Sequence, residues 1–148
     1  KPEKELPTVI DEETTGEEPI EMRYDTNIAE EFEGYRSGVM DRQLIVIDKM
    51  DQWKSIWNKI GKETPDPANM PKVDFSKQVV LVAFMGSKRT GGYSIKIHSV
   101  VKEGNKLIAK VYEENPPKDA MVTQAFTEPF HIIIIDKPTD VKSVEFKQ

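Results

Sequence analysis

The sequence contains no cysteine and only two histidines among its 148 residues. Disulfide bonds are therefore excluded, as are the cysteine-rich sites that hold structural zinc. Without cysteines, the redox compartment stays open. Long apolar runs are also lacking: the longest unbroken one is Val79–Met85, far short of the roughly 20 apolar residues that a transmembrane helix needs.

A basic block is missing as well, and the acidic charge is concentrated at the N-terminus. Residues 1–22 contain two lysines, eight acidic residues and no aromatic residue, so their net charge is −6. The whole chain carries −5, which leaves +1 for the remainder. A near-neutral domain without clustered Lys and Arg argues against nucleic acid as a partner. We expect a disordered acidic leader or linker at residues 1–22, followed by a single domain at residues 23–148.

The leader is open to two interpretations of about equal weight. The chain begins at Lys1 rather than Met, so we expect it to be trimmed, with any targeting segment already removed. An acidic stretch with Thr and Pro would suit a tether between a removed anchor and the domain. An ordinary frayed terminus would have the same composition.

The remaining pattern is mostly that of β-strands. Apolar or alternating segments predict about six or seven strands, at residues 19–24, Leu44–Ile47, Gln78–Met85, Tyr93–His98, Leu107–Tyr112, Phe130–Ile135 and Val141–Phe146. Residues 27–34 are too polar and acidic to assign. Turn residues at Glu103-Gly104-Asn105 predict a hairpin. The expected fold is therefore α+β, with a twisted, mostly antiparallel sheet, sandwich- or half-barrel-like, and one packed helix.

One helix is predicted between the second and third of these strands. Its apolar residues recur at spacings of three and four: Met50, Trp53, Ile56, Trp57 and Ile60. Asp48 is expected as the N-cap, Asp51 lies in the first turn, and Gly61 is expected to end the helix. Because Trp53 and Trp57 share the apolar face, we favour packing against the sheet over a binding surface.

The segment Gly86–Ser94 is unusual because it combines three glycines with Lys88 and Arg89. A phosphate-binding loop would require Lys directly after Gly91, where the sequence has Gly92, and a helix rather than a strand after it. We therefore reject nucleotide binding. A wide hairpin turn in which the glycines serve the backbone geometry is the favoured interpretation, and partner recognition is the alternative.

A second unusual segment, Thr123–Phe130, leads into a strand. Pro129 at the strand entrance costs no ladder bond and permits a cis peptide. Phe126 is either a lid over the core or an exposed anchor for a partner, with the lid favoured.

Catalytic residues are hard to place in this sequence. A nucleophile needs a base beside it, and only His98, expected on a solvent-exposed strand face, and His131, in a buried strand, are available. Ser87 and Ser94 lie outside any nucleophile-elbow motif. The many carboxylates stand in no informative context, and no calcium-loop pattern is present. We expect no enzyme activity, no metal and no cofactor.

The order of motifs resembles the PrcB C-terminal domain family. The matching motifs are Pro71–Ser76, Val79–Gly86, Thr90–Ile95, Val122–Ala125 and Pro129-Phe130. The resemblance extends over residues 42–146 and is strongest over residues 73–135. Members of this family are domains of secreted or lipid-anchored bacterial proteins, named after an accessory subunit of a surface serine-protease complex.

This resemblance implies a non-catalytic binding or accessory domain outside the cytoplasm, in a lipoprotein, with a protein such as a secreted protease as its partner. A lipid-modified cysteine would then lie just before Lys1. The two motif segments supply the candidate partner-binding residues, which are Lys88, Arg89, Thr90, Gly91, Gly92, Tyr93, Thr123, Gln124 and Phe126. If both segments lie at one edge, Tyr93 would stack on Phe126 or Phe130, and the edge would be a structural lock or a docking surface.

Three other functions stay open. A protease inhibitor would present Lys88-Arg89 to a trypsin-like cleft. A cell-surface carbohydrate-binding module would expose Trp53 or Trp57 on a flat face. A hydrolase would use dispersed carboxylates in a deep pocket. The oligomeric state is not determined by the sequence.

Overall fold

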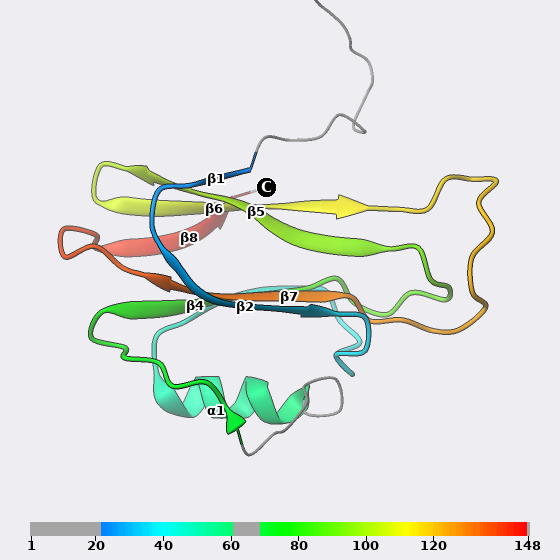
Figure 1. The fold of residues 1–148 in the computed structure, drawn as a ribbon, viewed down its shortest axis with the longest axis horizontal. Helices are drawn as coiled ribbons and strands as arrows, with labels where there is room; N and C mark the ends of the chain where they lie inside the picture. The colour runs from blue at the N-terminus through cyan, green and yellow to red at the C-terminus, as the bar shows by residue number, and fades with distance from the viewer. Residues whose placement is uncertain (1–21, 61–68, 148) are drawn as a thin grey trace, which may run out of the picture.

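The computed structural model describes residues 22–60 and 69–147. Its eight strands form two four-stranded sheets that pack face to face, and the helix covers the outer face of one sheet (Figure 1). The expected α+β fold is confirmed, and its sheet is a sandwich rather than a half-barrel. The expected leader, apart from Met22, lies outside the described residues.

Each sheet has its own strand order, and the helix packs on one of the two sheets. Sheet A has the order β1 (Arg23–Tyr24), β5 (Ser94–Glu103), β6 (Lys106–Glu114), β8 (Ser143–Lys147). Sheet B has the order β2 (Ile28–Gly34), β7 (Phe130–Asp136), β4 (Gln78–Phe84), β3 (Gln43–Ile47), and α1 (Met50–Lys59) packs on it. Among the strands that the structure describes, β1 with β5 and β6 with β8 pair in parallel, and the other neighbouring strands pair antiparallel.

Strands β4 and β7 form the middle of the molecule and are covered on both faces. Val80, Val82 and Phe84 pack toward the helix, whereas Val79, Leu81 and Ala83 pack toward sheet A. Two apolar layers thus share the same two strands. This double burial explains why both segments are continuous apolar runs in the sequence.

The helix uses its tryptophans as core residues, as expected. Trp53 is fully buried and Trp57 is 2% exposed. The indole Nε1 of Trp53 donates a hydrogen bond to the Pro71 carbonyl oxygen at 3.0 Å, and Phe32 meets the Trp57 ring edge-on at 5.3 Å between centroids. A carbohydrate-binding face made of these two rings is therefore excluded.

Two expectations for the ends of the helix differ from the structure. The N-cap residue is Lys49 rather than Asp48, and no side chain caps the helix there. Asp51 does lie in the first turn. Gly61, the expected stop, falls outside the described residues.

The sequence failed to identify one strand, β2. Its three glutamates are exposed, while Phe32 turns inward against the helix-side core. An edge strand with one wet face and several acids has too few apolar residues for its alternation to be read. The segment Gly86–Ser94 was also misread: it is not a hairpin, because β4 and β5 belong to different sheets.

The hairpin and the last strand are confirmed in outline. Gly104 adopts a φ of +63° in the turn between β5 and β6. Strand β8 closes sheet A, as a parallel neighbour of β6. None of the described helices is long and apolar enough to cross a membrane.

Candidate functional site at one end of the sandwich

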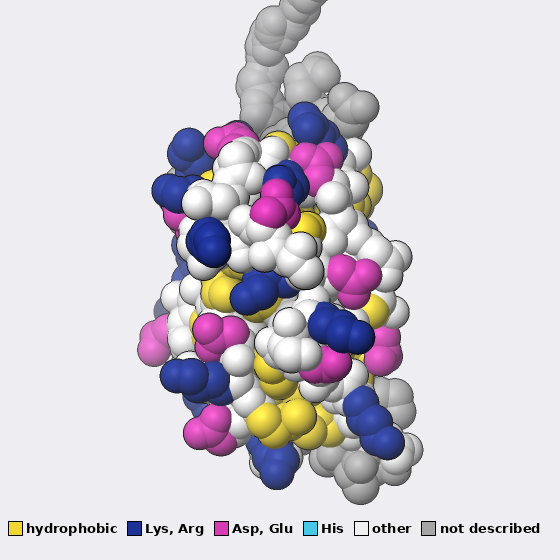
Figure 2. Space-filling view, turned by 90° about the vertical axis from the view of Figure 1, so that its left-hand side faces the viewer, with side chains coloured by type: hydrophobic (Ala, Val, Ile, Leu, Met, Phe, Trp, Pro, Cys, Tyr) yellow, Lys and Arg dark blue, Asp and Glu magenta, His cyan; other side chains and the backbone are white. Residues whose placement is uncertain are grey.

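Three loops meet at one end of the sandwich, on the right in Figure 1. They are residues 35–42, between β2 and β3, residues 85–93, between β4 and β5, and residues 115–129, between β6 and β7. We call this end the rim. The opposite end faces the viewer in Figure 2, where Lys, Arg, Asp and Glu side chains of both signs are scattered.

Backbone hydrogen bonds join the rim loops to one another. Lys88 and Thr127 exchange both of their backbone bonds, at 2.8 and 2.9 Å, and the Gly91 N–H donates to the Thr123 carbonyl at 3.0 Å. The hydroxyl of Thr127 also donates to the carbonyl of Thr90, at 2.9 Å. The two motif segments thus lie side by side, as expected. The rim is held by a small sheet-like ladder rather than by loose loops.

The first loop is attached to the same assembly. The Ser87 N–H donates to the Met40 carbonyl at 2.9 Å, and the Glu128 N–H donates to the Tyr35 carbonyl at 2.8 Å. Each of the other two loops is therefore bonded to residues 35–42. All three loops form one connected surface.

The glycines allow this close packing. A Cβ on Gly91 would lie 2.5 Å from the Thr123 hydroxyl oxygen. Gly92 has a φ of +94°, and a Cβ there would lie 2.7 Å from the Cβ of Pro116. Both positions exclude a side chain, the second also through its backbone conformation. The paired motifs are therefore explained by contact between the two loops.

Tyr93 does not stack as expected. The ring is half-buried against the core between the sheets, and the ammonium of Lys88 lies 5.2 Å from its centroid, a distance suited to a cation–π contact. Phe130 belongs to the helix-side core on the other face of sheet B. Phe126 is 67% exposed, so the expectation of a lid over the core is wrong.

The rim exposes large apolar side chains. Among the described residues, six large hydrophobic side chains are exposed, and four of them lie on the rim: Tyr35, Met40, Met121 and Phe126. Met121 is 99% exposed. Of these four residues, only Phe126 was predicted from the sequence as a candidate for partner binding. The signal for the others was a large apolar residue in a loop without strand or helix periodicity.

Polar groups and a hollow complete the rim. Arg89 and Gln124 are exposed, and Lys88 is half-buried. Residues Tyr112–Lys118, at the foot of the longest loop, line a hollow of about 660 Å³. Because both backbone groups of Lys88 are already paired with Thr127, Lys88 lacks the free backbone that a substrate-like inhibitor loop presents to a protease.

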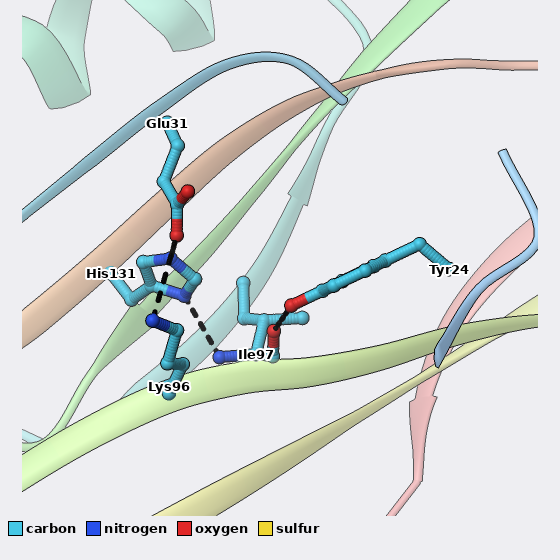
Figure 3. Close-up of polar contacts among 5 residues, drawn as sticks. All are labelled: Tyr24, Glu31, Lys96, Ile97 and His131. Atoms are coloured by element: carbon cyan, nitrogen blue, oxygen red, sulfur yellow. Dashed lines mark hydrogen bonds and ion pairs between the residues drawn. The ribbon is translucent and has the colours of Figure 1, made fainter. Parts of the chain in front are cut away.

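A second polar cluster extends from the space between the two sheets to the exposed Glu31 on the edge strand β2 (Figure 3). His131, on β7, is fully buried. Its Nδ1 accepts a hydrogen bond from the Ile97 N–H of β5 at 2.8 Å, and its Nε2 lies 2.5 Å from a carboxylate oxygen of Glu31. The hydroxyl of Tyr24 donates to the Ile97 carbonyl at 2.6 Å. Side chains thus satisfy both backbone groups of Ile97, and His131 links the two sheets.

The partners of His131 determine its protonation state. Because Nδ1 accepts a hydrogen bond, it carries no proton, so the ring is neutral and Nε2–H donates to Glu31. Burial lowers the pKa of His131 below its ordinary value, while the hydrogen bond and charge of Glu31 oppose that shift. Both ring nitrogens are occupied within the protein, so this imidazole has no free nitrogen for a substrate.

His98, unlike His131, differs from its expected position. It is 7% exposed rather than on a wet face, at a point where the register of β5 with β6 shifts between Ile97 and Ser99. Burial lowers its pKa. His98 borders a pocket of about 220 Å³ together with Lys110 and Arg23. Among the described residues, no group of three or more His, Cys, Asp or Glu side chains is placed to hold a metal ion.

Residues 79–136 match the PrcB C-terminal family. The resemblance seen in the sequence is thereby confirmed, over a segment shorter than the expected residues 42–146. No curated protein and no solved structure matches the chain.

The PrcB C-terminal match begins in β4 and ends with β7. It includes two of the three rim loops, residues 85–93 and 115–129, and all nine candidate residues chosen from the sequence. The first rim loop, α1, β3 and β8 lie outside it. The rim of this chain is therefore built mainly, but not wholly, from the segment that matches the PrcB C-terminal family.

Proposed function

We propose that this chain is a non-enzymatic accessory domain that binds another protein outside the cytoplasm through its rim. One observation carries the proposal: large apolar side chains are exposed together on loops whose backbones are fixed by hydrogen bonds. Exposed apolar residues scattered singly would need no explanation, but a group on one face favours an interface.

The rigidity of the rim strengthens the argument. A binding surface loses less entropy on association when its backbone is already ordered. Phe126 and Tyr35 offer aromatic anchors, and the exposed Arg89 adds a cationic group to the same rim. Aromatic and Arg side chains are the residue types most often found as binding hot spots.

The family gives the proposal its partner. Because the rim is built largely from the PrcB C-terminal segment, we propose a secreted protease as the bound protein, whose assembly or stability the domain supports. In the same proposal the chain is held at the cell surface by a lipid anchor ahead of Lys1. The internal pairing of both His131 nitrogens supports a non-catalytic role.

Site-specific photo-crosslinking tests the proposal in cells of the source organism. A benzoylphenylalanine at position 126 replaces one exposed aromatic ring by another, and the matched control carries it at position 105, in the exposed hairpin turn at the opposite end. We expect position 126 to capture one extracytoplasmic protease and position 105 to capture none. The captured protease is then purified and its Kd for the chain measured.

The binding measurement includes a rim variant. Replacing Phe126 and Met121 by Ser should raise the Kd for that protease at least 10-fold, because apolar anchors supply most of the binding energy in such interfaces. Equal capture from both positions, or an unchanged Kd in the variant, would contradict the proposal.

A further inference from the structure

The edges of the two sheets are not equally protected. An edge strand presents unpaired backbone groups, and proteins usually protect it with charges, bulges or shortness. Strand β2 carries three glutamates and a register irregularity. Strand β8 carries Glu145 and Lys147, and β1 is only two residues long. Three of the four edges therefore carry the usual protection.

Strand β3 has none of these protections. Its five residues, Gln43–Ile47, are all uncharged, include no proline, and pair with β4 without any register shift. It is bonded to β4 on one side, and none of the described residues pairs with it on the other. An uncharged edge strand rich in apolar and β-branched residues is a strong site for adding another strand.

A groove runs beside this edge. Ile45, Ile47 and Ile56 form its apolar part, and Asp51, Gln52 and Ser55 of α1 form its polar side. Its volume is about 350 Å³. An added strand would therefore gain apolar contacts on the helix side as well as backbone hydrogen bonds.

The residues that flank β3 identify the strand that fits. The sequence reads Asp41-Arg42, then the five uncharged residues, then Asp48-Lys49. If two copies of this segment pair antiparallel with Ile45 opposite Ile45, Arg42 lies opposite Asp48 and Asp41 lies opposite Lys49. All four flanking pairs then join opposite charges. A shift by two residues would instead place Asp48 opposite Leu44.

We propose that β3 is the interface of a two-fold symmetric dimer, in which the β3 strands of two copies pair antiparallel about Ile45. The two sheets B then form one continuous eight-stranded sheet. The register keeps odd-numbered residues on the helix side in both copies, so Ile45 of each copy closes the groove of the other.

Two neighbouring features define the extent of the interface. Arg42 already donates to Glu113 at 3.1 and 3.2 Å, and its guanidinium has further N–H groups that can donate to Asp48 of the second copy as well. Strand β8 lies near β3 in the other sheet. Its charged Glu145 and Lys147 disfavour strand pairing there, so the contact is centred on β3.

The first experiment measures mass against concentration by analytical ultracentrifugation of residues 1–148. We expect a reversible monomer–dimer equilibrium at micromolar concentrations. Ile45→Lys places two like charges on the two-fold axis and should abolish the dimer. Because Ile45 is partly buried against the core, circular dichroism must first show that this variant is folded.

Charge exchange tests the register without touching the core. Asp41 and Lys49 are exposed, and each single reversal, Asp41→Lys or Lys49→Asp, creates two like-charge pairs and should raise the dimer Kd roughly 3- to 10-fold. The double variant restores both pairs and should return the Kd to its original value. An equimolar mixture of the two single variants should form a heterodimer.

The matched control is Glu30→Lys, a charge reversal on the exposed edge strand β2 at the other side of sheet B. It should leave the dimer Kd unchanged. A chain that stays monomeric at 0.5 mM overturns the proposal. A dimer whose Kd rises equally in Glu30→Lys and Asp41→Lys also overturns it. The third contradicting result is a monomer whose β3 amides become protected from hydrogen exchange only when an apolar peptide is added.

Discussion

The two ends of the sandwich use their loops differently. At the end opposite the rim, Gly104 turns a short hairpin in open space, with nothing within 4 Å of where a Cβ would be. Charged side chains lie beside it: the ammonium of Lys102 donates to the Gly104 carbonyl and pairs with Asp140 at 2.8 Å. At the rim, the glycines are packed against neighbouring loops and the exposed side chains include large apolar ones.

The hairpin turn at Gly104 only reverses the chain, whereas the rim loops also form an ordered surface with exposed apolar side chains. The hairpin end needs only a residue that tolerates positive φ and charges that keep it soluble. The rim loops are tightly packed and joined by backbone hydrogen bonds, yet they expose Phe126 and Met121. A rigid backbone under exposed apolar side chains lowers the entropy cost of binding, which fits the accessory role that we propose.

The largest expected effect compares one glycine from each end. Gly92→Ala and Gly104→Ala both force a side chain onto a positive φ, which costs about 1–2 kcal/mol. At Gly92 the added Cβ also meets Pro116, which adds about 1–3 kcal/mol of overpacking. We expect urea denaturation to show a greater loss of the free energy of unfolding for Gly92→Ala. Equal losses would mean that the rim loops are not tightly packed.

The second expected effect is a pH dependence of the free energy of unfolding that arises from His131, which lies between the two ends of the sandwich. Burial lowers the folded-state pKa of His131, so the unfolded chain binds the proton more readily. The stability that neutral His131 contributes to the fold is therefore present above the unfolded pKa of about 6.5, and it is lost as the pH falls toward the folded pKa. Below pH 6.5 the free energy of unfolding should fall by up to about 1.4 kcal/mol per pH unit.

This pH dependence is measured by urea denaturation between pH 7.5 and 5.5, a window above the ordinary pKa values of the carboxylates. His131→Asn, which removes the imidazole, should flatten the slope. Burial also lowers the pKa of His98, so part of the slope should persist. An identical slope in the wild type and the variant would show that His131 is not the titrating group.

A smaller effect tests the hydrogen bonds of the rim. Thr127→Val removes the bond to the Thr90 carbonyl and should lower the free energy of unfolding by about 1 kcal/mol. Amide hydrogen exchange should accelerate at Lys88 and Gly91, whose N–H groups donate to Thr127 and Thr123 in the neighbouring loop. Asp140→Asn, at the opposite end, should leave those amides unchanged. Acceleration in both variants would show a global rather than a local effect.

The smallest expected effect on stability is at the surface of the rim. Phe126→Ser should change the free energy of unfolding by no more than about 0.5 kcal/mol, because the ring is mostly exposed. The same substitution is expected to weaken partner binding. A thermal denaturation curve with a large loss of Tm would instead assign Phe126 to the structure.

Local pattern was sufficient to predict the buried part of the fold. Continuous apolar runs identified β4 and β7, and the three-and-four spacing of Trp53 and Trp57 identified the buried face of the helix. Two unusual segments, Gly86–Ser94 with its three glycines and Thr123–Phe130, pointed to the rim. Strand β2 was not recognised, since three of its seven residues are exposed glutamates and only pairing with β7 makes it a strand.

The candidate site was only half visible in the sequence. Arg89, Gln124 and Phe126 were selected and are exposed on the rim. Met40 and Met121 were not, because an apolar residue in a loop gives no sign of whether it points inward. The glycines were selected as recognition candidates, yet their contacts with Thr123 and Pro116 show a packing role.

The sequence by itself determined most of the buried segments, where the chain turns, and that β3 carries no charge between two flanks that each contain one acidic and one basic residue. The tertiary structure decided that β4 and β5 part into different sheets, that three distant loops bond into one rim, and that His131 meets Ile97 across the sandwich. Burial and turning follow from residues close in sequence. Contacts between distant segments depend instead on how the two sheets stack, which no local pattern encodes.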